Sequence, residues 1–372
     1  MRNGQKNFVF ILILLVAATV WVISNDFRQN KVTQKGSPWR QVIGDASWKE
    51  RAYANLLVFQ NKIWILGGVT TADSPGEETG ELVNDSKVSQ KINAIFSSGK
   101  KLNDVWFSPD GARWNEATVS APWSARRSFS SLVFDDKIWV FGGFGDKGNL
   151  ADVWRSSNGV DWELVTDSAP WGQRRGHTVL VYKGKIWLLG GAGGNPDLGW
   201  EDTKNDVWCS SNGKDWEAKT DSAPWNPRME HISLVFDDKI WVIGGWGKWG
   251  ENYNDVWSFS DGAGWIKSAE QVDWSPRWGH AGVSYDDKIW ILGGNLRSEY
   301  EETAEKSSDI NEVWFSKNGI DWEKEKELVP WSPRRKLSAV VFQNKIWIAG
   351  GFWGKYEGGI RAFHDVWDYV AE

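Results

Sequence analysis

Arginines recur at one position along the chain, and in three places a second arginine follows at once. The repeated arginine stands three residues after a tryptophan in six copies: Arg51, Arg126, Arg174, Arg228, Arg277 and Arg334. The next residue varies, and it is arginine at Arg127, Arg175 and Arg335. A guanidinium group binds a carboxylate through two parallel hydrogen bonds, so three converging arginines would suit an acidic ligand. Charges on a solvated rim, which have little energetic consequence, are the alternative.

One acidic residue stands among these cations. Glu230 lies two residues after the repeated Arg228, where other copies carry Tyr53 or Lys336. A carboxylate here could act as the general base on a bound sugar. The alternative is an ion pair with a neighbouring arginine, because nearby cations lower a carboxylate pKa and weaken it as a base.

A tryptophan-rich repeat must position these residues. The chain of 372 residues contains 30 tryptophans, and four of their positions recur in a unit that is written six times. In one unit these are Trp123, Trp139, Trp154 and Trp162. The first and second are 16 residues apart in every unit, whereas the second and third are between 15 and 42 apart. One connection in each unit therefore absorbs all the change in length, and the conserved spacing elsewhere predicts regular strands packed through tryptophans.

Each unit reads as four antiparallel strands, a to d. The a and b strands are alternating or apolar runs joined by short polar turns such as Asp135-Asp136, and the c and d strands are joined by pairs such as Asn158-Gly159. Such pairs between β-rich runs indicate hairpins. Six four-stranded units predict an all-β, six-bladed β-propeller. The last unit lacks a fourth strand and residues 38–42 supply one, so Trp39 is expected to complete the last blade and close the ring.

The repeat resembles the Kelch repeat. The features that carry this resemblance are the double glycine after an apolar strand, the later tryptophan, and the proline- and arginine-containing segment that leads into the next repeat, over about residues 38–370. Where a Kelch repeat often has tyrosine in the third strand, four units have serine (Ser108, Ser156, Ser210 and Ser316). The resulting S-x-(D/N)-G-x-x-W is partly similar to the Asp-box turn of sialidases, but it is one residue shorter and indicates a hairpin.

The b–c loops and the d–a connectors are predicted to share one face of the propeller. The b–c loops are the connections that vary in length, so all of this variation lies on that face. Insertions on one face of a propeller usually mark the binding face. Five tryptophans outside the framework map there: Trp200, Trp246, Trp249, Trp278 and Trp353. They could bind the apolar faces of sugar rings or a peptide side chain, or pack beneath their own loops. The longest loop, 69–102, contains a possible short helix over 87–96 and is either a lid or an unstructured acidic loop.

The resemblance implies which residues contact a ligand. In Kelch propellers these are the residue after the repeated arginine, the one after that, and the residue after the double glycine. Carried over, they are Arg127, Arg175, Trp278 and Arg335, then Tyr53, Glu230 and Lys336, then Phe144, Trp246, Asn295 and Phe352. Glu230 is the candidate catalytic residue, and the other ten are candidate ligand-binding residues.

Metal and redox chemistry are not favoured. His177, His231 and His280 share one position in successive units, and Kelch repeats commonly carry a core histidine there. Some Kelch propellers are copper-radical oxidases, which need a cysteine beside a tyrosine at the metal. Cys209 is the only cysteine, which excludes an internal disulfide, and it is expected near the c–d turns on the opposite face. We expect no cofactor and no metal.

The first 24 residues differ from the repeats. Arg2 and Lys6 precede an apolar run of 17 residues, Phe8 to Ser24, which suits either a short transmembrane anchor or a cleaved export signal. We expect this segment at 1–24, a linker at 25–37 and the propeller at 38–372. An exported or membrane-anchored, monomeric protein follows from this interpretation.

Three functions remain open from the sequence. The first is a non-catalytic binding module for a glycan or acidic peptide. The second is an isomerase similar to the sialic-acid mutarotases, in which Glu230 and the arginines handle an acidic sugar. The third is a protein–protein interaction scaffold. A net charge of −6 argues against nucleic acid as a partner, since binding it requires a basic face.

Overall fold

The computed structural model describes residues 37–71, 99–194, 202–269, 272–296, 309–327, 329–355 and 359–370. Within these ranges every regular element is a β-strand. Residues Gly36–Glu372 form one compact unit, separate from Met1–Lys35. None of the described elements is a helix that could cross a membrane, and the apolar run at 8–24 lies outside the described residues.

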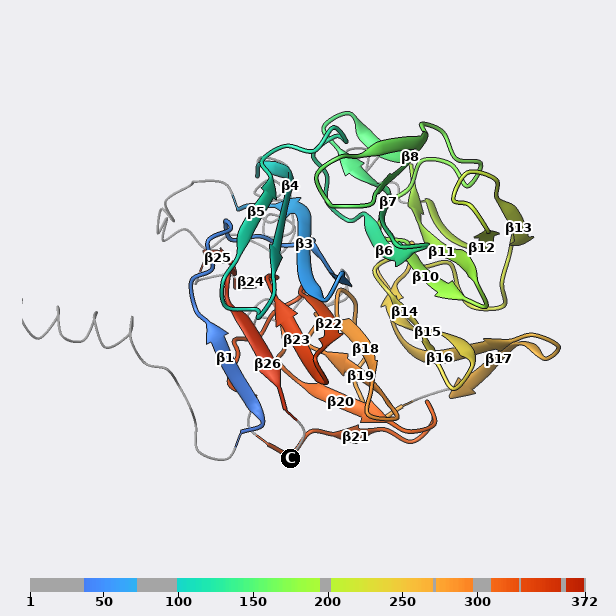
Figure 1. The fold of residues 1–372 in the computed structure, drawn as a ribbon. Helices are drawn as coiled ribbons and strands as arrows, with labels where there is room; N and C mark the ends of the chain where they lie inside the picture. Colours follow the sequence, from blue (N-terminus) through green and yellow to red (C-terminus); the bar gives the residue numbers. More distant parts are fainter. Residues whose placement is uncertain are drawn as a thin grey trace, which may run out of the picture. The chain divides into compact units, whose positions relative to one another are not determined.

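The strands form six antiparallel sheets of four, as the repeat predicts (Figure 1). The a strands are β2 (Asn55–Phe59), β6 (Ser130–Phe134), β10 (Thr178–Tyr182), β14 (Ile232–Phe236), β18 (Ala281–Tyr285) and β22 (Ser338–Phe342). The b strands are β3 (Lys62–Val69), β7 (Lys137–Gly145), β11 (Lys185–Gly193), β15 (Lys239–Trp246), β19 (Lys288–Leu292) and β23 (Lys345–Ala349). The c strands are β4 (Lys101–Ser108), β8 (Gly148–Ser156), β12 (Asp202–Ser210), β16 (Asn252–Ser260), β20 (Val313–Ser316) and β26 (Val366–Tyr369). The d strands are β5 (Asn115–Thr118), β9 (Glu163–Thr166), β13 (Glu217–Thr220), β17 (Gly264–Ala269), β21 (Glu323–Lys324) and β1 (Trp39–Ile43).

The ring closes through the first strand of the propeller. β1 pairs with β26, and Trp39 lies opposite Tyr369. Each a strand contacts the next around the ring, and β22 contacts β2. The predicted six-bladed propeller and its closure by Trp39 are therefore confirmed. An additional hairpin, β24 (Phe352–Lys355) with β25 (Gly359–Ala362), extends the last blade beyond its double glycine.

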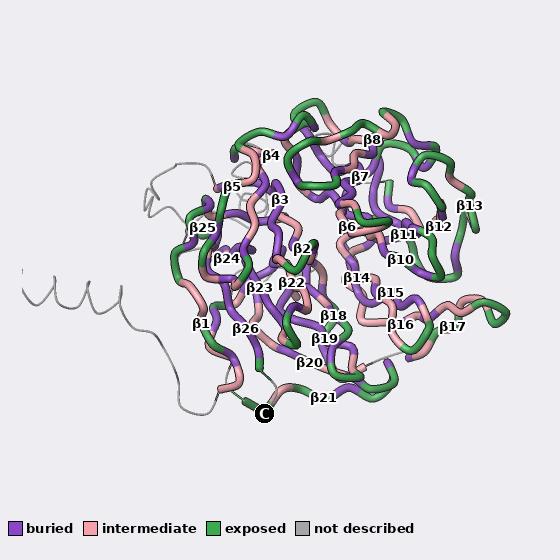
Figure 2. Tube along the Cα trace, viewed as in Figure 1, coloured by how far each residue is buried: buried purple, intermediate pink, exposed green. Residues whose placement is uncertain are grey.

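The a–b turns need a left-handed backbone. Both central residues of the turn between β6 and β7, Asp135 and Asp136, have φ near 50°, and Asp and Asn tolerate this conformation better than most residues. Figure 2 shows that the b strands are buried along their length, whereas the turns are mostly exposed. The b strands, buried on both faces, supply most of the core.

The c–d turns are built around a contact between blades. A Cβ atom on Gly159 would lie 2.2 Å from Cζ3 of Trp64, which belongs to the preceding blade, and Gly159 has φ of 76°. Two constraints, backbone conformation and a close tryptophan, therefore require glycine there. In the fourth blade the corresponding inter-blade contact is made by Phe259, whose ring centroid lies 5.6 Å from that of Trp187.

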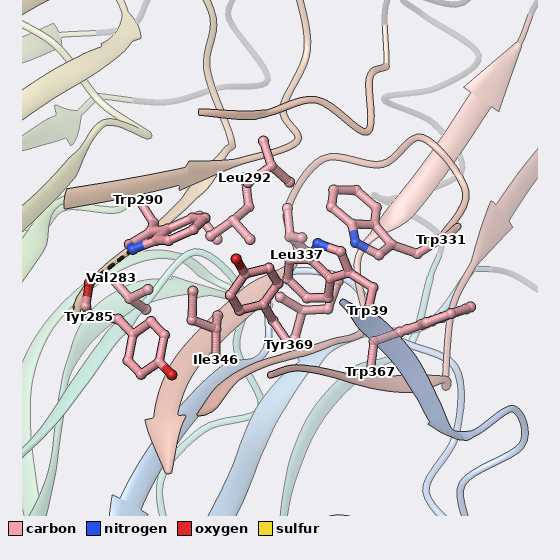
Figure 3. Close-up of a cluster of buried hydrophobic side chains, with 13 residues drawn as sticks. Trp39, Val283, Tyr285, Trp290, Leu292, Trp331, Leu337, Ile346, Trp367 and Tyr369 are labelled. Atoms are coloured by element: carbon pink, nitrogen blue, oxygen red, sulfur yellow. Dashed lines mark hydrogen bonds between the residues drawn. The ribbon is translucent and has the colours of Figure 1, made fainter. Parts of the chain in front are cut away.

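The first and fourth tryptophans of each unit pack edge to face. Trp123 and Trp162 have ring centroids 5.8 Å apart and an interplanar angle of 82°. In the last blade the fourth tryptophan is Trp39, which packs on Trp331 at 5.9 Å and on Tyr369 at 5.3 Å (Figure 3). The N-terminal strand thus restores the packing that the other five units make within themselves.

Replacing Trp39 by alanine should destabilise the propeller strongly. Trp39 is 2% exposed, and truncating a buried tryptophan costs about 3–5 kcal/mol. Denaturant unfolding of the two proteins measures this loss. Trp249→Ala is the matched control, because Trp249 is 57% exposed and its removal should change the free energy of unfolding by less than about 0.5 kcal/mol. Equal effects of the two substitutions would contradict closure through Trp39.

Candidate functional site

The six repeated arginines form the framework beneath the site. Each is buried, is at most 1% exposed, and donates to a carboxylate of a c strand or of the residue just before it. The pairs are Arg51–Asp104, Arg126–Asp152, Arg174–Asp206, Arg228–Asp255, Arg277–Glu312 and Arg334–Asp365. Arg126 also donates to the carbonyl oxygen of Gly142, the first residue of a double glycine, at 2.8 Å. These arginines tie each d–a connector to its blade, so their role is structural.

This framework brings together two of the positions that the Kelch resemblance names. The residue after the framework arginine forms a β-bridge with the residue after the double glycine of the same blade. These bridges join Arg127 to Phe144, Arg175 to Ala192, Met229 to Trp246, Trp278 to Asn295 and Arg335 to Phe352. Candidate residues that are 17 positions apart in the sequence therefore lie side by side at the d–a and b–c face.

The third position forms a ring around the axis. In all six blades it has a left-handed backbone: Tyr53, Ser128, Gly176, Glu230, Gly279 and Lys336, with φ between 51° and 62°. The amide of each residue donates to the carbonyl of its neighbour in the preceding blade at five of the six junctions, with distances of 2.7 to 3.2 Å. Four of these residues are not glycine, so the hydrogen-bonded ring must compensate the strain of that conformation.

Glu230 and Lys336 meet across this ring. Their Oε2 and Nζ atoms are 2.5 Å apart, with side chains 15% and 3% exposed. The intervening residue is Gly279, where a Cβ atom would lie 3.1 Å from Cδ and Cε of Lys336. The expected ion pair of Glu230 therefore exists, but its partner is a lysine from two blades away and not an arginine. Glycine between them leaves the space that the lysine side chain crosses.

Lys336 is a buried cation in an aromatic setting. Its Nζ atom lies 4.8 Å from the ring centroid of Tyr53 and 4.6 Å from that of Trp278. Burial lowers the pKa of Lys336 to about 8, since the ion pair with Glu230 opposes this shift only in part and Arg335 and Arg127 add to it. A large fraction of its amine is consequently neutral near pH 8.

Arg127 lies between two aromatic rings. Its guanidinium carbon is 5.3 Å from the centroid of Tyr53 and 5.1 Å from that of Phe144. Within the described ranges its side chain makes no ion pair or hydrogen bond, and its Nε atom is buried without a partner. Burial also raises the pKa of the Tyr53 phenol, although the positive charge of Arg127 opposes this effect. Arg127 thus presents an unneutralised cation within an apolar enclosure.

The other two arginines are buried, so the alternative of solvated rim charges is wrong for them. Arg175 is 5% exposed and donates to Oδ1 of Asn149 at 3.1 Å. Arg335 is 6% exposed and donates to Oδ1 of Asp309 at 2.9 Å. Asp309 also accepts hydrogen bonds from Asn295 at 2.7 Å and from the amide of Gly354 at 2.9 Å. Asn295 and Arg335 are therefore held to one carboxylate.

The aromatic candidates form a wall beside these cations. Trp246 and Trp278 have ring centroids 6.3 Å apart, and Tyr53 stacks on Phe352 at 6.3 Å with an interplanar angle of 21°. Phe352 is only 1% exposed. Phe352 thus supports Tyr53 and Arg335 from below, whereas the half-buried Trp246 and Trp278 offer surface to a ligand.

The remaining loop candidates lie apart from this wall or cannot be placed. Trp249 is exposed in a turn that Glu251 holds through a hydrogen bond to the Trp249 amide at 2.9 Å. Trp353 is half-buried in β24. Trp200 and the predicted helix over 87–96 fall outside the described residues.

The three repeated histidines are core residues of separate blades. His177, His231 and His280 pack on Trp171, Trp225 and Trp274 with centroids 5.9 to 6.4 Å apart. No cluster of three or more metal-binding side chains occurs in the part of the chain that the structure describes. Cys209 is buried in β12, near the c–d turn, as expected.

Comparison with known proteins identifies the repeat. The sequence model of the KLHDC2/KLHL20/DRC7 Kelch-repeats domain matches residues 93–294, more than half of the chain. The chain belongs to the Kelch-repeat family. The solved structure of YjhT is similar with a TM-score of 0.62 and 18% identity, over 86% of this chain and 99% of that chain. At this identity the likeness shows the fold. No curated protein matches the chain.

Sequence reasoning missed the buried partners of the candidate arginines. Asn149 lies near the start of β8 and Asp309 lies in a b–c connection. Both precede the repeated c-strand motif, so the repeat does not single them out. The framework acids were detectable, because an acid stands two residues before the third tryptophan in every Kelch unit, for example Asp152 before Trp154. Six repeated acids beside six repeated arginines are a signal for pairing.

The core histidines should make this propeller less stable in mild acid. Burial lowers the pKa of His231 from 6.5 to about 3, and it lowers those of His177 and His280 well below 6.5. Between pH 6.5 and 3 the unfolded chain therefore binds protons that the folded chain does not, so stability present above pH 6.5 is lost as the pH falls. His231 should remove about 2 kcal/mol at pH 5 relative to pH 7.

Denaturant unfolding at pH 7 and pH 5 tests this. His231→Gln should reduce the loss between the two pH values by about 2 kcal/mol. Trp249→Ala is the control, because Trp249 is 57% exposed and has no titratable group, so its removal should leave the loss unchanged. An unaltered pH dependence in His231→Gln would contradict a buried neutral imidazole.

Proposed function

We propose that this Kelch propeller is a binding module that takes an acidic ligand, a glycan or an acidic peptide, at the mouth of its central ring. The observation that carries the proposal is Arg127, whose guanidinium lies between Tyr53 and Phe144 with no acidic partner among the described residues. Arg127 is half-buried, so its charge is partly desolvated without a counter-ion, and an incoming carboxylate would supply one.

The local balance of charge supports an anionic ligand. Four cations, Arg127, Arg175, Arg335 and Lys336, gather with two acids, Glu230 and Asp309. The site is positive, although the whole chain has a net charge of −6. A positive group of residues in a low-dielectric enclosure concentrates the field and attracts anions.

The ligand should also carry an apolar face. Trp278 lies next to Arg335 and Lys336, with its ring centroid 5.1 Å from the Arg335 guanidinium carbon. Trp246 packs on Trp278. An apolar surface with a few charged groups is typical of a small-ligand site. An acidic sugar and a peptide with an acidic and an aromatic residue both have this combination. A protein partner that uses the same cations is the third possibility.

A sugar isomerase is the second candidate function. Its support is the distance of 2.5 Å between the Glu230 carboxylate and the Lys336 amine. Opening and closing a sugar ring needs a group that removes a proton from the anomeric hydroxyl and a group that protonates the ring oxygen. Glu230 is proposed as the base in this function.

Export or membrane attachment is part of the proposal, on the support of the apolar run at 8–24. Trp39 pairs with Tyr369 at the c–d turn end of the last blade. The chain that precedes Trp39 therefore joins the propeller at the end of the blade away from the mouth.

Removing Arg127 should weaken the binding of acidic ligands. Calorimetric titration of neutral and acidic saccharides, N-acetylneuraminate among them, and of acidic peptides should detect ligands that carry a carboxylate. Arg127→Ala should reduce their affinity by roughly 10–100-fold, because a hydrogen bond to a charged group contributes about 1.5–3 kcal/mol. The double variant Arg175→Ala, Trp246→Ala should lose binding further.

Arg113→Ala is the matched control for this titration. Arg113 lies on a c–d turn with its side chain 83% exposed, so its removal should leave affinity unchanged. Heat from neutral and acidic ligands alike, or an equal loss in both arginine variants, would refute the acidic site. No heat with any saccharide or peptide would direct the search to protein partners.

If the site is an isomerase, Glu230→Gln should abolish most of its activity while binding persists. General base catalysis contributes about 10²–10⁴-fold, and Gln keeps the shape of the side chain. Polarimetric or NMR measurement of anomer interconversion with each acidic sugar that binds is the assay. A wild-type protein that binds an acidic sugar without accelerating interconversion would leave the binding function and exclude this one.

A further inference from the structure

A lysine in the central ring has the setting of a reactive amine. Lys336 extends from the sixth blade across Gly279 to Glu230 in the fourth. Lysine is almost never buried without a specific partner or role, and this one has a left-handed backbone. A binding site that needed only positive charge would be better served by an exposed lysine or by an arginine at this position.

The groups around the amine match the needs of addition to a carbonyl group. Glu230 Oε2, at 2.5 Å, is placed to take a proton from the Lys336 ammonium and to return it later. The Tyr53 and Trp278 rings cover Nζ at 4.8 and 4.6 Å. They exclude water, which would hydrolyse a carbon–nitrogen double bond. The 15% exposed Glu230 side chain is where this pair reaches solvent.

The cations beside the amine specify which carbonyl compound fits. Arg127 and Lys336 both lie against the ring of Tyr53, with Arg127 at 5.3 Å from its centroid. When Arg127 binds the carboxylate of a ligand, the carbonyl carbon of that ligand lies near Nζ of Lys336 only if the carboxylate and the carbonyl group are close together in the ligand. The ligand class with this arrangement is the 2-oxo acids, either free or as the ring-opened form of an acidic keto sugar.

We propose that Lys336 forms an imine with the carbonyl carbon of a 2-oxo acid whose carboxylate binds Arg127. Glu230 first accepts a proton from the Lys336 ammonium. The lone pair on Nζ then attacks the carbonyl carbon, and the electron pair of the C=O bond moves to oxygen. A proton passes from Nζ to that oxygen, which gives a neutral carbinolamine. The resulting hydroxyl leaves as water with a proton from Glu230 as the nitrogen lone pair forms the C=N bond. The step needs no oxidant or reductant, and it rests on the proposed acidic site.

Reductive trapping tests this inference. The full chain is incubated with pyruvate and sodium cyanoborohydride at pH 8, and the modified lysines are identified by peptide mass spectrometry. Lys336 should be modified about tenfold or more faster than Lys62, because Arg127 can hold the pyruvate carboxylate nearby and Glu230 can accept a proton from the Lys336 amine. Lys62 is the internal reference, since its Nζ atom also lies over an aromatic ring, Phe107, at 4.5 Å.

Variants and probes separate a specific site from general reactivity. Lys336→Arg keeps the charge and should lose the adduct, and Arg127→Ala should slow modification of Lys336 about tenfold without affecting Lys62. Propanone, a ketone without a carboxylate, should not favour Lys336. Should Lys336→Arg fail to fold, site mapping in the wild type and in Arg127→Ala decides the matter.

The outcomes distinguish this inference from the proposed function. Modification of Lys336 no faster than that of Lys62, or equally by propanone, overturns the imine. If acidic ligands still bind in calorimetry, the binding module stands without it. If no acidic ligand binds and no adduct forms at Lys336, both fail.

Discussion

The buried pair of a framework arginine and a carboxylate is the interaction on which the site depends. Each such arginine is buried. It donates hydrogen bonds to one or two carboxylate oxygens and to the carbonyl oxygen of a glycine. Removing one partner of a buried pair leaves an uncompensated charge, which costs about 3–5 kcal/mol. Because the pair fixes the backbone of the d–a connector, it also fixes the backbone positions of the next two residues.

That rigidity explains why neighbouring residues of the same type differ in role. Arg126 has its acid in its own blade, whereas Arg127 is placed by the same backbone and has none among the described residues. The framework pairs therefore position the backbone, and the side chain of the variable residue remains available for a ligand. Such preorganisation lowers the entropy that binding must otherwise overcome.

The fold could be predicted from the sequence because the four-strand unit occurs six times. The tryptophan spacings predict the number of strands, and the absence of a fourth strand in the last unit indicates that Trp39 completes it. Only those parts of the site that occupy a repeated position could be predicted. The Kelch resemblance gave the positions of Arg127, Arg175, Trp278 and Arg335. The Glu230–Lys336 pair did not, because it joins blades four and six across Gly279, and no periodic pattern encodes which side chains cross the ring. Asp309, which binds Arg335, could not be predicted either, because it lies in a connection of variable length and occupies no repeated position.

The functional information lies where the sixfold symmetry is broken. All six ring positions have the same backbone conformation and nearly the same hydrogen bonds, so the fold does not require their side chains to differ. Two are glycine, and a Cβ atom at either would press against Glu230 or Lys336. The two glycines thus leave the space in which one acid and one amine meet across the ring. Burying this pair adds little net stability, since desolvation offsets most of the attraction. An arrangement that gains little for folding is better explained by what it offers to a ligand.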